Sequence, residues 1–147
     1  FWMHNGLMED AEGKLSKSRG ERITLEEVFE DCPPAALRFY LLSHHYREFT
    51  PYSPEGLLEA CQEGERLGIN AVDCMIIDPT DPREDDETAP LVSRFEEALD
   101  DDLDTPKALD VLRDLDIIAA NRLKNEGNLA PISGMYSIFQ CVLGVFS

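Results

Sequence analysis

The sequence predicts a mainly α-helical fold, in which a helical bundle follows a small, loop-rich N-terminal part. Apolar residues recur at helical spacing in the second half, as in Ala108, Leu112, Leu115 and Ala119. Helix-start signals, in which a capping residue precedes Pro or Glu, recur along the chain, whereas residues 1–13 are typical of a short strand and turn. Together these patterns indicate an all-α bundle joined to a smaller segment.

The first half is expected to hold one strand and three helices. These are a strand and turn over 1–13, a helix over 25–31, a buried helix over 35–44, and a longer helix that begins at 54 and ends at 67 or 77. Asn5-Gly6 is the turn signal, and Thr24 with Glu27 forms a capping box. Residues 35–44 are apolar on nearly every face, which predicts a buried helix that Pro34 begins.

The longest of these helices begins at Ser53-Pro54, a capping residue followed by proline. It carries Leu57, Leu58 and Cys61, which we expect on one face. Gly68 is a weak point in the helix, so residue 67 and residue 77 both remain open as its last residue.

The second half is expected to begin with an acidic linker near 78–90 and to continue as helices. Two prolines and several acids in this segment are not expected to build a packed element. The acidic run from Asp81 to Asp104 is expected to face solvent. Further helices are expected near 91–99, after Thr105-Pro106, and over a last segment marked by Ile132, Met135, Phe139, Val142 and Phe146.

Length and charge limit the possible functions. A chain of 147 residues with 43% hydrophobic residues can build one core, or one core plus a remnant of another domain. The formal net charge of -17 argues against nucleic acid binding by the whole surface. Residues 1–50 hold six basic and nine acidic residues, whereas residues 51–147 hold seven and twenty-one. A basic edge is therefore expected only near the N-terminus.

The cysteines and the hydropathy indicate a cytoplasmic protein without a membrane span. No apolar run approaches the roughly 20 residues of a membrane helix, and no signal-peptide pattern opens the sequence. The four cysteines lack the paired spacing of a metal site, which predicts buried free thiols in a reducing compartment and no metal. They are Cys32, Cys61, Cys74 and Cys141.

The most informative motif is Lys14-Leu15-Ser16-Lys17-Ser18, which we call the lysine motif. Two lysines three positions apart, with hydroxyl residues beside them and Gly20 after them, are typical of a mobile cationic loop that closes over a polyphosphate. A solvated surface loop is the alternative interpretation of these five residues taken alone.

The flanks of this motif carry a resemblance to a family. They include the segments 2–6, 36–43, 45–47, 52–55 and 95–106. With them the chain resembles the cysteinyl-tRNA synthetases, class I aminoacyl-tRNA synthetases whose second nucleotide motif is Lys-Met-Ser-Lys-Ser. Leu15 stands where the family usually has Met, which is a volume-conserving change. The chain departs from the family at the start of the following helix, where it reads Asp31-Cys32-Pro33-Pro34-Ala35 and the family usually has a single Asp-Pro.

The resemblance implies two parts. Residues 1–31 would be the end of a catalytic domain, with the lysine motif and a connecting helix. Residues 32–147 would be a helical bundle like the anticodon-binding domains of tRNA synthetases. The nucleotide-binding half, the cysteine pocket and the zinc site of such an enzyme would precede Phe1, so we interpret the chain as an expressed fragment or a natural truncation.

The resemblance also implies a reaction: ATP-dependent activation of cysteine, with Mg²⁺ expected, and transfer of cysteine to its tRNA. Lys17 and Lys14 are the catalytic candidates, because cations stabilise the charge that grows on the leaving pyrophosphate. Ser16 and Ser18 join them as ATP-binding candidates. The zinc of the parent enzyme would be held outside this segment, so no metal site is predicted here.

Arg38 and Arg47 are the candidates for contacts to the tRNA for cysteine. Each has a simpler alternative, which is a carboxylate partner for Arg38 and a polar helix terminus for Arg47. His4 would lie near the active site, although a packed histidine beside Trp2 is the alternative.

Two other functions remain open. One is a related cysteine ligase that delivers cysteine to an amino sugar, as in mycothiol biosynthesis. The other is a non-catalytic helical module that binds tRNA or a partner protein. Under the synthetase interpretation as well, we expect the chain by itself to be inactive in cysteine activation, because one lysine loop without the other half of the enzyme cannot hold ATP and cysteine together.

Overall fold

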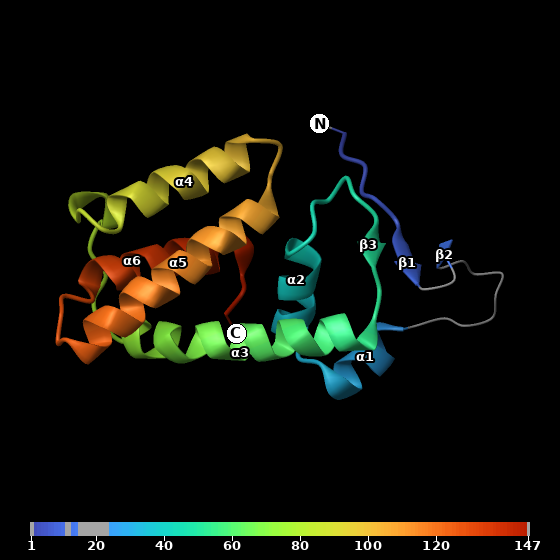
Figure 1. The fold of residues 1–147 in the computed structure, drawn as a ribbon, viewed down its shortest axis with the longest axis horizontal. Coiled ribbons are helices and arrows are strands. Elements are labelled where there is room, and N and C mark those ends of the chain that lie inside the picture. The colour runs from blue at the N-terminus through green and yellow to red at the C-terminus, as the bar shows by residue number, and fades with distance from the viewer. Residues whose placement is uncertain (1, 11–12, 15–23, 147) are drawn as a thin grey trace.

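The computed structural model of the chain describes residues 2–10, 13–14 and 24–146. Figure 1 shows long helices on one side of the molecule, a small sheet on the other, and α2 between them. The elements are β1 (Met8–Asp10), β2 (Gly13–Lys14), α1 (Leu25–Asp31), α2 (Pro34–Leu42), β3 (Thr50–Pro51), α3 (Pro54–Met75), the 3₁₀ turn η2 (Pro82–Glu84), α4 (Ala89–Asp100), α5 (Thr105–Lys124) and α6 (Ala130–Leu143). The mainly helical fold class is confirmed.

The sheet joins the N-terminal segment to the chain after α2. Its strand order is β2-β1-β3, with β1 antiparallel to β2 and parallel to β3. The Gly6 amide donates to the Tyr46 carbonyl over 2.6 Å, and a Cβ at Gly6 would overlap the Glu48 carbonyl oxygen. Gly6 precedes β1 outside any turn, so the prediction of a turn at Asn5-Gly6 is wrong. The glycine is needed there because two backbones approach closely.

Helix α1 begins as its capping box predicts. The Glu27 amide donates to Thr24 Oγ1 over 3.3 Å, and the Thr24 amide donates to Glu27 Oε2 over 2.9 Å. These two bonds satisfy amides that the first helical turn leaves without a partner.

Helix α2 is buried on one face only, which corrects the prediction of a wholly buried helix. Ala36, Phe39 and Tyr40 are buried, whereas Leu41 is 42% exposed. An apolar residue on every face does not by itself bury every face, because the neighbours of α2 cover one side.

Helix α3 is one continuous helix that passes through Gly68 and ends at Met75. Its N-cap Ser53 accepts a hydrogen bond from the Gly56 amide over 2.9 Å. Leu57 is buried, but Leu58 is 58% exposed. Consecutive residues on a helix point about 100° apart, so these two leucines do not share a face.

The main core lies where α3, α4, α5 and α6 meet. Leu109, Leu112 and Leu115 of α5 are fully buried there, as is Phe139 of α6. The Phe95 and Phe139 rings pack edge to face, with their centroids 4.6 Å apart. Helix α4 packs against α5, whereas α5 and α6 pack against each other and against α3, so these helices bury their apolar stripes as their periodicity predicts.

The acidic segment between α3 and α4 is packed, contrary to its predicted behaviour. The Thr80 amide donates to the Ala130 carbonyl over 3.1 Å, and Thr88 Oγ1 donates to the Pro82 carbonyl over 2.6 Å. Pro82 and Thr88 are buried. Gly134 of α6 permits this packing, because a Cβ at that position would overlap the Thr80 carbonyl oxygen. The prediction of an unpacked linker rested on the acids and prolines of the segment. The amino-acid composition does not show the hydrogen bonds that the backbone makes to distant residues.

A buried carboxylate joins α3 to α5. Asp116 is only 4% exposed. It accepts hydrogen bonds from Arg66 Nη1 over 3.0 Å and from Asn70 Nδ2 over 2.8 Å. The two donors satisfy a charge that would otherwise be costly to bury. We call these three residues the Asp116 cluster.

Candidate functional site

The lysine motif begins at the end of a strand. Lys14 is the last residue of β2 and lies opposite Glu9 of β1 in the antiparallel pair. Ser16, Lys17 and Ser18 lie outside the described residues, as does the side chain of Lys14. Their proposed roles in ATP binding and catalysis therefore stay predictions. The described chain resumes at Thr24, which caps α1.

The strand that precedes the lysine motif is held against the rest of the molecule. The Thr50 amide donates to the Leu7 carbonyl over 3.0 Å, and the Tyr52 amide donates to the Glu9 carbonyl over 2.6 Å. The hydroxyl of the buried Tyr40 donates to the Pro51 carbonyl, which ties β3 to α2. The start of the lysine motif is thus fixed relative to α2 through β1 and β3.

The segment between α2 and β3 binds the carboxylate of Asp102, which lies in the turn that follows α4. Tyr46 Oη donates to Asp102 Oδ1 over 2.6 Å, and Arg47 Nη2 donates to the same oxygen over 2.8 Å. Arg47 Nε donates to Asp102 Oδ2. We call Tyr46, Arg47 and Asp102 the Asp102 corner. It connects residues that are about 55 positions apart in the sequence.

The charge on Asp102 is stabilised by these donors. Hydrogen bonds from Arg47 and then from Tyr46 hold the pKa of the Asp102 carboxyl well below its usual range. The same bond to Asp102 raises the pKa of the Tyr46 phenol. The guanidinium carbon of Arg47 also lies 5.0 Å from the centroid of the Tyr46 ring, a cation–π distance.

The backbone at this corner adopts an uncommon conformation. Asp102 and Leu103 both have φ of 57°. L-residues other than glycine visit this left-handed region rarely, and Asp does so more readily than Leu. The two residues form the turn between α4 and α5, and this turn presents the Asp102 carboxylate to Tyr46 and Arg47.

Both candidates for tRNA contact have partners inside the chain. Arg38 Nη1 donates to the Gly144 carbonyl over 2.6 Å, which is a backbone partner and not the predicted carboxylate. Arg47 binds the carboxylate of Asp102. It is therefore more than a polar residue near a helix terminus, which was the alternative expected for it. A guanidinium has five N–H donors, and some of them stay available on each arginine. The contacts to tRNA therefore stay predictions.

Most basic side chains of the bundle also have acidic partners. The pairs are Arg66–Asp116, Arg83–Glu96, Arg94–Asp114, Lys107–Asp104, Arg113–Glu63 and Arg122–Asp85. Each pair neutralises a cation that could otherwise meet a phosphate. Over residues 51–147, where acids outnumber bases by twenty-one to seven, the bundle therefore presents little positive surface.

His4 lies close to Trp2 at the N-terminal end of the described chain. The two rings stack with their centroids 6.1 Å apart. Trp2 is 91% exposed and His4 is also exposed. His4 is therefore not the packed histidine that its neighbour suggested, and its place near an active site stays a prediction.

Sequence reasoning missed Asp102. It lies within the acidic run that was expected to face solvent, yet it binds two side chains of a distant segment. Asp102 is still exposed, as expected for this run, whereas Asp85 is only partly exposed and accepts a hydrogen bond from Arg122 Nη2 over 2.7 Å. No spacing rule could have found either contact, because each joins segments far apart in the chain.

The predicted free cysteines are seen, but their burial varies. Cys32 and Cys74 are buried, Cys61 is partly buried and Cys141 is exposed. Across 2–10, 13–14 and 24–146, no three His, Cys, Asp or Glu side chains gather as metal ligands would. Within the same part of the chain, none of the helices has both the length and the apolar character needed to cross a membrane.

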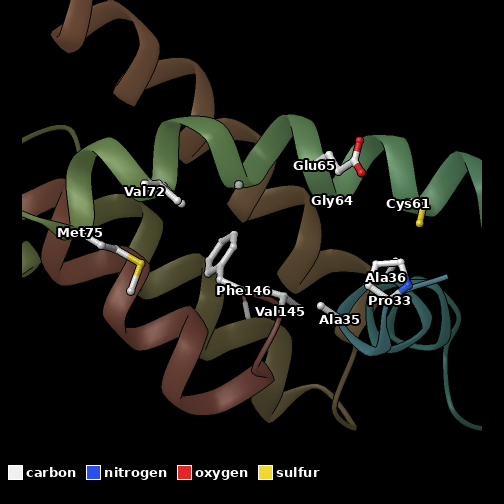
Figure 2. Close-up of a pocket in the computed structure, with 12 residues that line it drawn as sticks. Pro33, Ala35, Ala36, Cys61, Gly64, Glu65, Val72, Met75, Val145 and Phe146 are labelled. Carbon is white, nitrogen blue, oxygen red and sulfur yellow. The ribbon is translucent and has the colours of Figure 1, made fainter. Parts of the chain in front are cut away.

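An apolar groove runs along α3. It has a volume of about 540 Å³. Figure 2 shows Val145 and Phe146 from the C-terminal segment on one side of it, and Ala35 of α2 nearby. Its lining is almost wholly hydrocarbon, with Glu65 at its edge. The groove therefore has no group for acid–base chemistry at its centre.

Two models of known families match separate segments of the chain. The model of the tRNA synthetases class I (C) catalytic domain matches residues 1–62, and that of the DALR domain matches residues 94–147. The first match contains the sheet, the lysine motif and the start of α3. The second contains most of α4 together with α5 and α6.

Individual relatives cover nearly the whole chain. The cysteine–tRNA ligase of Geobacter sulfurreducens is 38% identical over 138 residues, which are 88% of this chain and 28% of the relative. That of Pelobacter propionicus is 34% identical over all of this chain and 35% of its own length. That of Thioalkalivibrio sulfidiphilus is 35% identical over all of this chain and 31% of its own length. The chain thus spans about a third of these curated relatives, and it belongs to the cysteinyl-tRNA synthetase family as a segment that matches part of the class I catalytic domain and the DALR domain.

Proposed function

We propose that this chain is a functional part of a cysteine–tRNA ligase, which activates cysteine with ATP and transfers it to the tRNA for cysteine. The single observation that carries the proposal is the lysine motif, which begins at the last residue of β2 and precedes α1. The full length of the chain aligns with proteins named cysteine–tRNA ligases. Lys14 and Lys17 supply positive charge where pyrophosphate leaves, and Ser16 and Ser18 order the phosphates.

In this proposal the sheet and the Asp102 corner position the lysine motif. The sheet holds β2 beside β1, and the Asp102 corner holds the segment after α2 against the α4–α5 turn. The ATP-binding motif and the helical bundle are thereby connected through α2 and its flanking segments. Such a connection would keep the lysine motif at a fixed position relative to the bundle when tRNA is bound.

The bundle offers few free cations to a tRNA, because its basic side chains are largely paired. We propose that Arg38 and Arg47 contact the tRNA backbone through the N–H groups that their internal partners leave available. Divalent Mg²⁺ would accompany ATP. The zinc of the parent enzyme would be bound outside this segment, and we propose the cytoplasm as the compartment.

A chimeric enzyme tests the proposal. In the Geobacter sulfurreducens ligase, the matching segment is replaced with this chain, and cysteine-dependent ATP–pyrophosphate exchange is measured. Lys17→Ala is expected to lower the rate by about 10²- to 10³-fold, the usual cost of removing one donor that stabilises transition-state charge. Lys124→Ala, which removes an exposed lysine at the end of α5, is the matched control and should leave the rate unchanged.

Equal rates for the Lys17→Ala and Lys124→Ala chimeras would contradict the assignment. The same chimera identifies the acceptor: charging of the tRNA for cysteine supports the ligase, and transfer to an amino sugar in its place supports the mycothiol-type alternative. The chain alone should show no exchange, because one lysine loop cannot hold ATP and cysteine together.

Binding of tRNA by the isolated chain tests the bundle. The tRNA for cysteine and a non-cognate tRNA are titrated at two salt concentrations. Selective binding that weakens with salt is expected, and Arg47→Ala should reduce the salt slope by about one unit for each phosphate that the arginine neutralises. Equal, weak binding of both tRNAs would leave the bundle as a scaffold or as a protein-binding module.

A further inference from the structure

Two thiols meet where α1 ends against α3. Cys32 is the C-cap residue of α1, and Cys61 lies in the N-terminal half of α3. The Cys61 thiol donates to Cys32 Sγ, with the two sulfur atoms 3.9 Å apart. The residues are 29 positions apart in the sequence. Neither belongs to the lysine motif or to the Asp102 corner, so the proposed function does not use them.

The two cysteines differ in their access to solvent. Cys32 is 3% exposed, and its thiol also lies 3.5 Å from the Pro33 carbonyl oxygen. Cys61 is partly exposed. A groove of about 570 Å³ is lined by both cysteines together with Val28, Tyr52 and Leu57. Cys61 also lines the groove of Figure 2, in which its sulfur is directed away from α3 toward the Pro33 side. A small reagent can therefore reach Cys61.

The environment makes the reactivity of the pair unequal. Burial, and then the neighbouring Cys61 thiol, raise the pKa of Cys32 to about 11. Cys32 is therefore protonated at neutral pH and unreactive by itself, since the thiolate is the nucleophile. Cys61 is the more accessible partner and reacts first. Cys32 is already in contact with it and can complete the exchange.

We propose that Cys32 and Cys61 form a reversible disulfide in response to a low-molecular-weight disulfide such as oxidised glutathione. Cys61 loses its proton to solvent and attacks one sulfur of the reagent, which forms a mixed disulfide and releases one thiol. Cys32 then loses its proton and attacks Cys61 Sγ, which breaks the mixed disulfide and releases the second thiol. The protein pair is oxidised by two electrons and the reagent is reduced to two thiols.

The disulfide would tie the helix after the lysine motif to the bundle. A disulfide requires a sulfur–sulfur distance of about 2.05 Å, so the thiols must approach by about 2 Å. A small shift of the α1 end suffices, because Cys32 lies just after the last turn of α1. The link closes a loop that includes α2, β3 and the Asp102-binding segment. It therefore restricts α1 relative to α3 and stabilises the folded state.

The test uses the purified chain with Cys141→Ser, which removes the exposed thiol. The chain is incubated with oxidised glutathione under native conditions and is analysed by intact mass and peptide mapping. We expect a mass lower by two hydrogens, one Cys32–Cys61 linked peptide and a free Cys74. The thermal midpoint should rise, and reduced dithiothreitol should reverse both changes. The same reaction in denaturing urea should be about tenfold slower or more, because unfolding separates the thiols.

Two variants separate the steps. Cys32→Ser should accumulate a stable glutathione adduct at Cys61, because the resolving thiol is absent. Cys61→Ser should leave Cys32 unmodified, because Cys32 is buried. A wild-type pair that stays as a Cys61 adduct would overturn the proposal, as would linkage of Cys61 to Cys74, or pairing as fast in urea as in the folded chain. None of these outcomes depends on whether the parent protein charges tRNA.

Discussion

The Asp116 cluster and the Asp102 corner both use a carboxylate to hold an arginine, but in different surroundings. Asp116 is 4% exposed and lies inside the bundle between α3 and α5. The Asp102 side chain is 45% exposed and lies between a loop and a turn. A buried carboxylate that loses a partner stays in a poorly solvated place, whereas an exposed one is solvated by water. The Asp116 cluster therefore contributes mainly to the stability of the fold. The Asp102 corner mainly sets the position of the segment between α2 and β3.

The largest effect is expected in the apolar core of the bundle. Phe139→Ala should lower the free energy of unfolding by about 3 to 5 kcal/mol, because it leaves a cavity against Phe95 and loses apolar burial. Urea unfolding followed by circular dichroism measures the change. Val142→Ala, at a position on α6 that is 54% exposed, is the control and should change the free energy by less than about 1 kcal/mol. Equal effects would show that α6 is not packed as described.

The next effect concerns the Asp116 cluster itself. Asp116→Ala should lower the free energy of unfolding by about 2 to 3 kcal/mol, because Arg66 and Asn70 lose their acceptor inside the bundle. The same urea unfolding measures it. Arg66 is itself 57% exposed, which keeps the loss below that of a fully buried pair.

The matched control for Asp116 is Asp114→Ala, which breaks the exposed pair with Arg94. It should cost about 0 to 1 kcal/mol, the usual range for a surface ion pair. A loss for Asp114 as large as that for Asp116 would remove the distinction between buried and exposed carboxylates.

A smaller, local effect is expected at the sheet. Gly6→Ala should separate the β1 strand from the segment after α2, because the added methyl group overlaps the Glu48 carbonyl oxygen. Hydrogen exchange should show loss of protection at the Thr50 and Tyr52 amides, by about tenfold or more, while α5 stays protected. Gly64→Ala on α3, where a Cβ meets nothing within 4 Å, should instead stabilise the helix by about 0.5 to 1 kcal/mol. Unchanged protection in Gly6→Ala would contradict the close approach.

The smallest effect on global stability is expected at the Asp102 corner. Asp102→Ala should shift the thermal midpoint by only a few degrees at most, but it should increase hydrogen exchange over residues 44–49. Nuclear magnetic resonance of the Tyr46 and Arg47 side chains measures the loss of order directly. Asp101→Ala, next to Asp102 and without a bond to either side chain among the described contacts, should leave residues 44–49 unchanged.

The same corner predicts a pH dependence. Because the folded-state pKa of Asp102 is lower than the unfolded value of about 3.9, its stabilising contribution is present above pH of about 4. The contribution is lost only as the pH falls through the lower folded-state pKa. A carboxyl ¹³C titration should therefore show Asp102 still ionised below a pH of about 3.9. A titration midpoint near the usual value of about 3.9 would mean that Arg47 and Tyr46 do not bind the Asp102 carboxylate in solution.

Much of the fold was predictable because it depends on local pattern. The capping box of Thr24 and Glu27, the proline starts and the periodicity of about 3.6 residues each act within one helix, and each helix lies close to its predicted range. One error was local, because helix geometry alone separates the faces of Leu57 and Leu58. The other errors arose where a distant segment decides. The Asn5-Gly6 turn, the unpacked acidic linker and the wholly buried α2 were wrong for that reason.

The candidate site divides in the same way. The lysine motif and the family were recognised from contiguous residues, and the family is confirmed by the comparisons. The partners of Arg38 and Arg47 were not recognised, because Gly144 and Asp102 are far from them in sequence. The roles of Lys14 and Lys17 stay predictions, since the side chains that carry them lie outside the described part.

The sequence by itself determined the helical class, the helix starts and the family, because capping, periodicity and motif spacing are properties of neighbouring residues. The tertiary structure alone decided which charges pair, where the acidic segment packs and which thiols meet. Tyr46 meets Asp102 where the segment after α2 reaches the α4–α5 turn, and Cys32 meets Cys61 where the end of α1 reaches α3. Such contacts depend on where whole elements lie in space, and no local pattern records that.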